Sequence, residues 1–243
     1  MRNKELLLFF SFIMLLSCSK SEIIPSGIIL SDYLRLHDDK KLDEVIACAG
    51  SKETNIDIVF VYYYPIKGSS EYRYYETDNA NVDPNNFANY TLKNFSKEPV
   101  LGNKLARFNR DLSHEAWGIV TFLSEGKVHK SNPIRLKQKT KPTIYNTSIN
   151  IDNTKPMSPK FSWNASLSND DVIYFQALVN DRDGFISGTY TTDLYFRYYD
   201  TSNVVLTINT AAPPKLDITK KHTITILGVS EDNWVNLHAE KIF

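Results

Sequence analysis

The chain has 243 residues, with 28 Lys and Arg against 28 Asp and Glu, so its formal net charge is zero. A chain without a basic excess lacks the electrostatic footprint that nucleic acid requires, so we expect no nucleic-acid partner. Its two cysteines, Cys18 and Cys48, are too few for a disulfide framework, so we expect core burial to hold the fold.

The N-terminus has the pattern of a secretory signal. Arg2 and Lys4 precede an apolar run over residues 6–16, and this run is shorter than the ~20 residues needed to span a bilayer. A basic N-terminus, a short apolar run and a small residue at the cleavage site are typical of a cleaved signal peptide. We therefore expect residues 1–17 to be a signal peptide and residues 18–27 to be a tether.

Leu15-Leu16-Ser17-Cys18 resembles the lipobox of bacterial lipoproteins. In that family the Cys thiol takes a diacylglycerol, so the resemblance implies lipidation at Cys18, with palmitate-type chains that anchor the protein to a membrane. Ser19, where an Asp often signals inner-membrane retention, implies the outer membrane. The periplasmic side and the cell surface both remain open. The alternative is an ordinary cleaved signal with Cys18 simply nearby.

The first block of strand signals covers residues 28–138. Aromatic and β-branched residues recur there in short stretches between turn residues, which predicts β-strands. Residues 56–64 are apolar enough for a central strand, residues 124–127 predict a hairpin turn, and Asp83 before Pro84 predicts one or two helical turns. The expected strands are residues 44–49, 56–64, 71–76, 104–108, 116–123 and 128–136.

A second block, residues 139–243, repeats this plan after a polar linker at residues 139–143. We expect Lys137, Lys139 and Lys141 to be solvated there. Both blocks end with a strand, a tight polar turn and a final strand, which indicates tandem domains. The expected strands are residues 144–151, 160–165, 172–180, 185–191, 194–199, 204–208, 223–228 and 234–243.

Phe161-Ser162-Trp163 lies where the second strand of a fibronectin type III domain carries its core Trp. Residues 131–136 resemble the last strand of such a domain. The resemblance covers nearly all of the mature chain and implies an all-β fold. That fold would be two tandem antiparallel β-sandwiches, fibronectin type III-like or immunoglobulin-like. Trp163 is then expected to anchor the second core.

No catalytic or metal-binding motif is present in the sequence, so we expect neither an enzyme nor a cofactor. The five histidines are scattered. The segment at residues 181–184 begins like a calcium loop but lacks the Glu at its twelfth position, which favours an ordinary turn. A looser metal site that includes Asp170 and Asp171 stays open. Cys48 lies in an apolar run and is expected to be a buried, unreactive thiol.

Clustered aromatic residues are the remaining candidates for a binding surface. They occur at residues 62–64 and 72–75 and again at residues 195–199. Neighbouring residues in a strand point to opposite sides, so some rings are expected to face outward, where they could stack on sugars. We expect a non-enzymatic, lipid-anchored envelope protein that acts as an interaction module for a protein or a glycan. The alternative is a carbohydrate-binding accessory lipoprotein of a polysaccharide-uptake system.

Overall fold

The computed structural model describes residues 27–155, 157–180, 184–209, 211–217 and 219–243. Residues 1–26, with Cys18 and the expected signal peptide, lie outside the described residues, as do residues 181–183 of the expected turn. Within the described residues, no helix is both long and apolar enough to cross a membrane.

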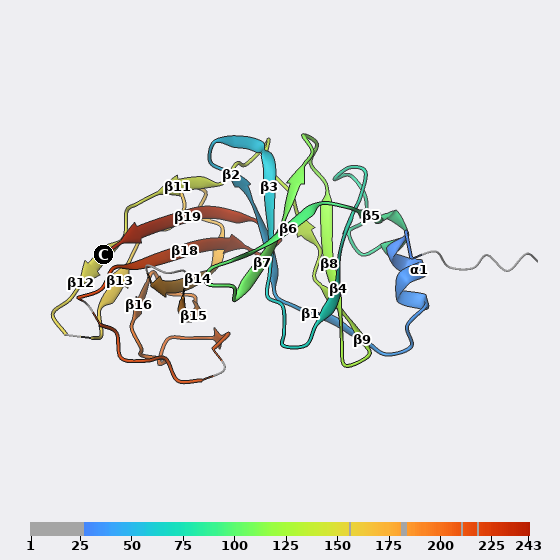
Figure 1. The fold of residues 1–243 in the computed structure, drawn as a ribbon. Helices are drawn as coiled ribbons and strands as arrows, with labels where there is room; N and C mark the ends of the chain where they lie inside the picture. The colour runs from blue at the N-terminus through green and yellow to red at the C-terminus, as the bar shows by residue number, and fades with distance from the viewer. Residues whose placement is uncertain (1–26, 156, 181–183, 210, 218) are drawn as a thin grey trace, which may run out of the picture.

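The first block forms two facing sheets (Figure 1). One sheet has the order β1 (Lys40–Val45), β9 (Lys127–Ser131), β8 (Trp117–Ser124), β4 (Ser70–Glu76) and β5 (Thr91–Lys93), with β10 (Ile134–Arg135) also paired to β8. The other has the order β2 (Ala47–Lys52), β3 (Asn55–Tyr63), β7 (Leu105–Asp111) and β6 (Ser96–Val100). The predicted central strand is β3, between β2 and β7.

The second block also forms two sheets. The larger has the order β11 (Ile144–Asn146), β19 (Val235–Ile242), β18 (His222–Ser230), β14 (Asp171–Asn180), β15 (Phe185–Thr191) and β17 (Leu206–Thr207). The smaller has the order β12 (Asn150–Asp152), β13 (Lys160–Ser162) and β16 (Tyr195–Arg197).

The strand pairings of the first block recur in the second. Each block opens with a short strand that pairs in parallel with a strand near the end of that block, β1 with β9 and β11 with β19. The strand that follows pairs antiparallel with the next, β2 with β3 and β12 with β13. The central pairs β4–β8 and β14–β18 are antiparallel as well. The predicted all-β fold class, with antiparallel sheets in tandem, is confirmed.

Each sandwich has its own apolar core between its two sheets. Trp163 is buried in the second core, at 5% exposed, as predicted, and it packs edge-on against Tyr174. The first core contains a side chain from the second block, because Trp234 is fully buried among Val61, Tyr74 and Phe108. The two cores are therefore not independent.

The structure also differs locally from the predicted elements. Helix α1 (Leu30–Arg35) was not expected, and it packs Leu30, Tyr33 and Leu34 on the outer face of the first sheet. The predicted helical turns are the 3-10 helix η1 (Phe87–Asn89), whose cap is Asn86. The Asn86 side chain accepts a hydrogen bond from the Ala88 amide at 3.2 Å, whereas the Asp83 carboxylate accepts one from the Asn85 amide at 2.9 Å. The edge strands β5 and β6 were not predicted either.

A fully buried ion pair lies in the first sandwich. Arg110 donates through Nε and Nη2 to the two carboxylate oxygens of Glu76 at 2.7 and 2.8 Å. The Tyr74 hydroxyl donates to Glu76 at 2.8 Å. The guanidinium also donates to the carbonyls of Leu112 and His114. The pair thus fixes the loop between β7 and β8.

We expect Glu76→Gln to lower the free energy of unfolding by about 3–5 kcal/mol, because it leaves the Arg110 charge buried without a carboxylate. Urea unfolding followed by tryptophan fluorescence measures the change. The exposed pair Arg73–Glu71 supplies the control, since Glu71→Gln should cost less than about 1 kcal/mol. Similar losses of stability in the two variants would show that the buried ion pair stabilises the fold no more than the exposed pair does.

Candidate binding site at the junction of the two sandwiches

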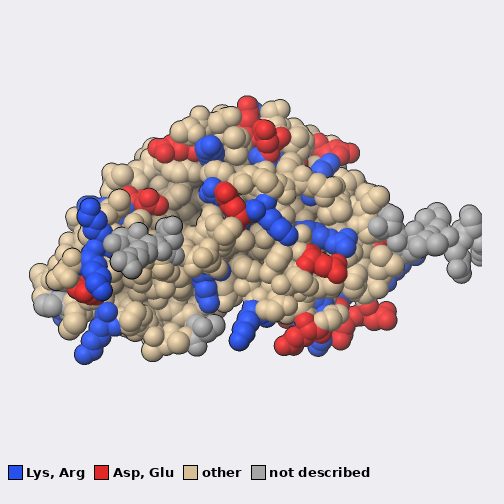
Figure 2. All heavy atoms as spheres, in the orientation of Figure 1, with Lys and Arg blue, Asp and Glu red and all other residues tan. Residues whose placement is uncertain are grey.

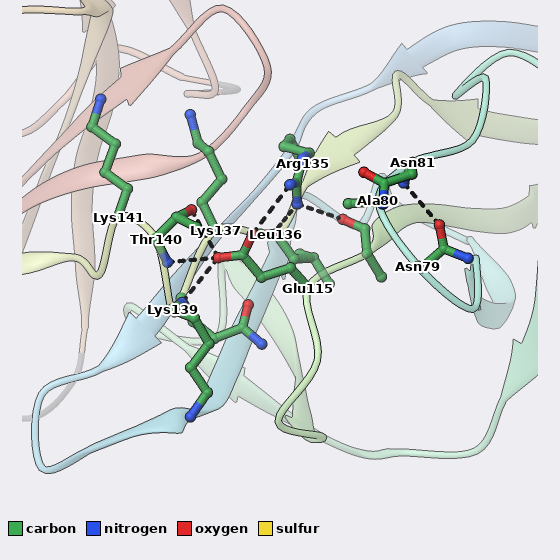
Figure 3. Close-up of polar contacts among 12 residues, drawn as sticks. Asn79, Ala80, Asn81, Glu115, Arg135, Leu136, Lys137, Lys139, Thr140 and Lys141 are labelled. Carbon is green, nitrogen blue, oxygen red and sulfur yellow. Dashed lines mark hydrogen bonds and ion pairs between the residues drawn. The ribbon is translucent and has the colours of Figure 1, made fainter.

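The linker between the sandwiches is held in place by Glu115 (Figure 3). Its Oε1 atom accepts hydrogen bonds from the backbone amides of Lys139 and Thr140 at 3.0 and 2.7 Å, and Arg135 donates to its Oε2 at 3.1 Å. Burial alone would raise the pKa of this carboxyl, but the bonds from Thr140 and Lys139 hold it below its usual value. Gln138 donates to the His114 carbonyl at 2.7 Å, so the linker also contacts the loop that Arg110 fixes.

The three linker lysines each form an ion pair; Lys137 and Lys141 are half-buried, contrary to expectation, whereas Lys139 is exposed as expected. Lys137 pairs with Asp232 at 2.9 Å and Lys141 pairs with Asp170, both in the second block. Lys139 pairs with Asp57 in the first block. Figure 3 shows Lys137 and Lys141 pointing to one side of the linker and Lys139 to the other. The linker therefore ties the sandwiches together.

Main-chain contacts also cross the junction. The Ala49 amide donates to the Asn233 carbonyl at 3.0 Å, and the Arg135 amide donates to the Asp232 carbonyl at 2.9 Å. The indole of Trp234 donates to the Lys141 carbonyl at 2.7 Å. These bonds hold the turn between β18 and β19 against the first sandwich.

An apolar cluster fills the junction behind these bonds. It joins Leu105 and Cys48 of the first block to Phe175, Leu227 and Val235 of the second. Burial raises the pKa of the Cys48 thiol to about 12, so the thiolate that would act as a nucleophile is suppressed. Cys48 is a packing residue of this cluster, half-buried rather than fully buried as predicted.

A groove of about 800 Å³ opens at this junction. The first block contributes Pro84, Asn85, Trp117, Asn132, Pro133 and Lys137. The second contributes Asp170, Val172 and the turn Ser230, Glu231, Asp232 and Asn233. The half-buried Trp117 donates its indole N–H to the Ala80 carbonyl at 3.1 Å, which sets the angle of the ring. Sequence reasoning missed this groove because its residues come from turns that are distant in the chain.

The side chains in the groove suit hydrogen bonding more than catalysis. Asparagine amides both donate and accept, and the Trp117 ring offers an apolar face. Asp170 and Asp232 are already paired with lysines. No cluster of three or more metal-ligating side chains occurs among the described residues. Figure 2 shows basic and acidic side chains interspersed over the visible face, without a continuous basic surface there.

The acidic pair proposed as a loose metal site has structural partners. Asp170 and Asp171 each accept a hydrogen bond from the Asn236 amide, at 3.0 and 2.9 Å. Asp171 also accepts from the Ser166 amide at 3.0 Å. Lys141 also pairs with Asp170. Protein donors therefore already bind both carboxylates.

The predicted aromatic clusters lie mostly in the interior. Of the rings singled out, Tyr195 is exposed, at 40%, and Tyr64, Tyr72 and Tyr199 are half-buried. The buried rings are Tyr62, Tyr63, Tyr74, Tyr75, Phe196 and Tyr198. These strands therefore do not present a row of exposed rings.

No protein-family model matches the chain, and no curated protein matches it in sequence. Among solved structures it is similar to the FN1–FN3 domains of chicken CNTN1, with a TM-score of 0.30 and 9% identity over 85% of this chain and 68% of that one. It is also similar to a two-domain fibronectin type III segment of chicken tenascin, with a TM-score of 0.27 and 13% identity over 83% of this chain and 97% of that one. These similarities say nothing about a ligand.

A histidine at the junction makes its stability sensitive to pH. The His238 ring lies 4.7 Å from the Tyr145 ring between centroids. Burial, together with the nearby Arg107 charge, lowers the pKa of His238 to about 4 from 6.5. A base with a lowered pKa in the folded state stabilises the fold fully above pH 6.5 and loses that contribution as the pH falls toward 4.

We therefore expect wild type to lose up to about 3 kcal/mol more stability than His238→Phe over this pH interval. Urea midpoints measured at steps of pH for both proteins give the difference, since the shared carboxylates cancel between them. Parallel curves for the two proteins would mean that His238 does not titrate at a shifted pKa.

Proposed function

We propose that this protein is a non-enzymatic, lipid-anchored envelope protein that binds a partner in the groove at the junction of its sandwiches. The observation that supports this proposal is that contacts between the two sandwiches fix the junction in one arrangement. Trp234 of the second block is buried in the first core, and paired lysines and main-chain bonds fix the walls of the groove. A preformed site loses less entropy on binding than a flexible one.

The position of the expected anchor fits this role. Helix α1 lies at the end of the first sandwich that faces away from the second (Figure 1). Gly27, the first described residue, precedes this helix in the chain, and its carbonyl accepts a hydrogen bond from Tyr75 of the first sandwich. A lipid on Cys18 would hold that end at the membrane. The junction and the second sandwich would then project away from the lipid surface, where a partner in the envelope can reach them.

A carbohydrate ligand is a second candidate, and one observation favours it. The groove combines the half-buried ring of Trp117 with the amides of Asn85, Asn132 and Asn233. Sugars stack on aromatic faces and bond to planar polar groups. A sugar bound in this way would lie at the junction rather than on the aromatic strands.

Lipidation is tested by labelling cells with a radioactive fatty acid. Wild type should incorporate the label and fractionate with the outer membrane, because acylation of Cys18 supplies the anchor. Cys18→Ala should lose both properties. The control is Cys48→Ala, which should keep the label because that thiol lies in the folded junction and not in the expected lipobox. Equal labelling of wild type and Cys18→Ala would contradict the anchor.

The groove is tested with a photo-reactive amino acid placed at the exposed position Glu231 on its rim. In living cells this position should form a discrete adduct, and Val172→Arg inside the groove should reduce the adduct at least about fivefold, the loss typical of an energetically important contact. The exposed turn residue Glu125 is the matched control position. The same adduct from both positions, or no effect of Val172→Arg, would refute partner binding in the groove.

A further inference from the structure

The groove at the junction is adjacent to a second, apolar recess of about 240 Å³. Its walls are formed by Ile173, Phe175, Tyr190, Leu206 and Val229 of the second block and by Cys48 of the first. The rings of Phe175 and Tyr190 lie 4.7 Å apart between centroids. This recess differs from the groove in chemistry, because aliphatic and aromatic side chains dominate its lining.

The two hollows share part of their lining. Asn132 and Asn233 border both of them. Asn233 donates its amide to the Pro133 carbonyl at 3.1 Å, and its backbone is in the left-handed region with φ of 63°. The strand β14 continues from one hollow to the other, since Val172 lines the groove and Ile173 lines the recess. The two hollows meet at Asn132 and Asn233, and we call the pair the trough, with the groove as its polar end and the recess as its apolar end.

Apolar side chains of the trough remain open to solvent. Val172 is 51% exposed in the groove, and Leu206 is 45% exposed at the recess. Leu206 belongs to β17, a strand of two residues at the edge of its sheet. Exposed apolar groups beside a recess favour burial against a ligand.

The trough is also acidic. Its lining contains five carboxylates, on Asp43, Glu44, Asp170, Glu231 and Asp232, against the single lysine Lys137. Lys130, Lys141 and Lys41 pair with Asp43, Asp170 and Glu44 from outside the lining, which still leaves one more carboxylate than lysines. Within the described residues, Glu231 is exposed and has no ion pair. A cationic group on the ligand would therefore be favoured.

We propose that the trough binds an extended peptide segment of a partner protein in which an aliphatic or aromatic side chain is flanked by Lys or Arg. This inference rests on the proposed function and names the chemistry of its partner. The apolar side chain occupies the recess beside Phe175, and the basic side chains face the carboxylates near Glu231. The amides of Asn132 and Asn233, between the two hollows, meet the polar backbone of the peptide.

The probes are short fluorescent peptides with a common Gly-Ser background. One has a central Leu-Phe flanked by lysines, the second has the same centre flanked by glutamates, and the third keeps the lysines but has Ser-Ser at its centre. Anisotropy with the full-length chain should show the tightest binding for the first peptide. The other two should each bind about tenfold more weakly, a loss of about 1.4 kcal/mol.

Two variants localise the binding. Leu206→Ser removes an exposed apolar group from the recess, and Glu231→Lys reverses a charge on the rim. Each should weaken the first peptide about tenfold. The matched controls are Ile242→Ser, which is also an exposed apolar residue at 65%, and Glu125→Lys on a distant turn. Neither control should change the affinity, and circular dichroism should show the same fold for all four.

Equal binding of the lysine and glutamate peptides would overturn the proposal, as would unchanged affinity in Leu206→Ser or no binding of any peptide. These results leave the proposed function separately testable. If no peptide binds but the photo-adduct at Glu231 still depends on Val172, the groove has a partner of another chemistry. If the adduct is also insensitive to Val172→Arg, the groove is not the binding site.

Discussion

The ion pair between Glu76 and Arg110 is the contact on which the junction depends. Both side chains are fully buried, so neither can exchange its partner for water. The remaining N–H groups of Arg110 donate hydrogen bonds to the loop before β8. That loop contains Glu115, whose carboxylate accepts hydrogen bonds from backbone amides of the linker. The linker carbonyl at Lys141 in turn accepts the Trp234 indole. A charge inside the first sandwich thus positions a side chain of the second.

Apolar packing holds the two sandwiches together at the junction, in addition to this series of hydrogen bonds. Two domains on one chain move relative to each other unless their interface is large and hydrophobic. Here Trp234 is inserted into the first core, and Cys48 and Leu105 pack against Phe175 and Leu227. Movement of the second sandwich would expose these side chains. The walls of the trough therefore keep their spacing before any partner arrives.

Local signals in the sequence predicted local features of the fold. The strand β3, the hairpin turn at Glu125 and Gly126 and the buried Trp163 follow from apolar runs and turn residues a few positions apart. The junction could not be predicted this way. Ser51 and Thr143 exchange hydrogen bonds although they are 92 positions apart, and the linker residues Lys137 and Lys141 pair with partners 95 and 29 positions away. Helix α1 has six residues, too few for a clear helical period.

The aromatic strands show how a correct local rule leads to a wrong expectation about function. Side chains alternate at the end of β3 as expected, since Tyr63 lies in the first core, Tyr62 lies near Tyr145 of the second block, and Tyr64, just after the strand, packs on the junction cluster. That other side is not solvent, because the second block covers it: Tyr62 is 7% exposed and Tyr64 donates to the Ile208 carbonyl at 3.4 Å. In a tandem protein, an outward-facing ring can thus build the junction instead of a binding surface. Burying these rings fixes the two sandwiches in one arrangement, and that arrangement creates the trough from residues that show no pattern in the sequence.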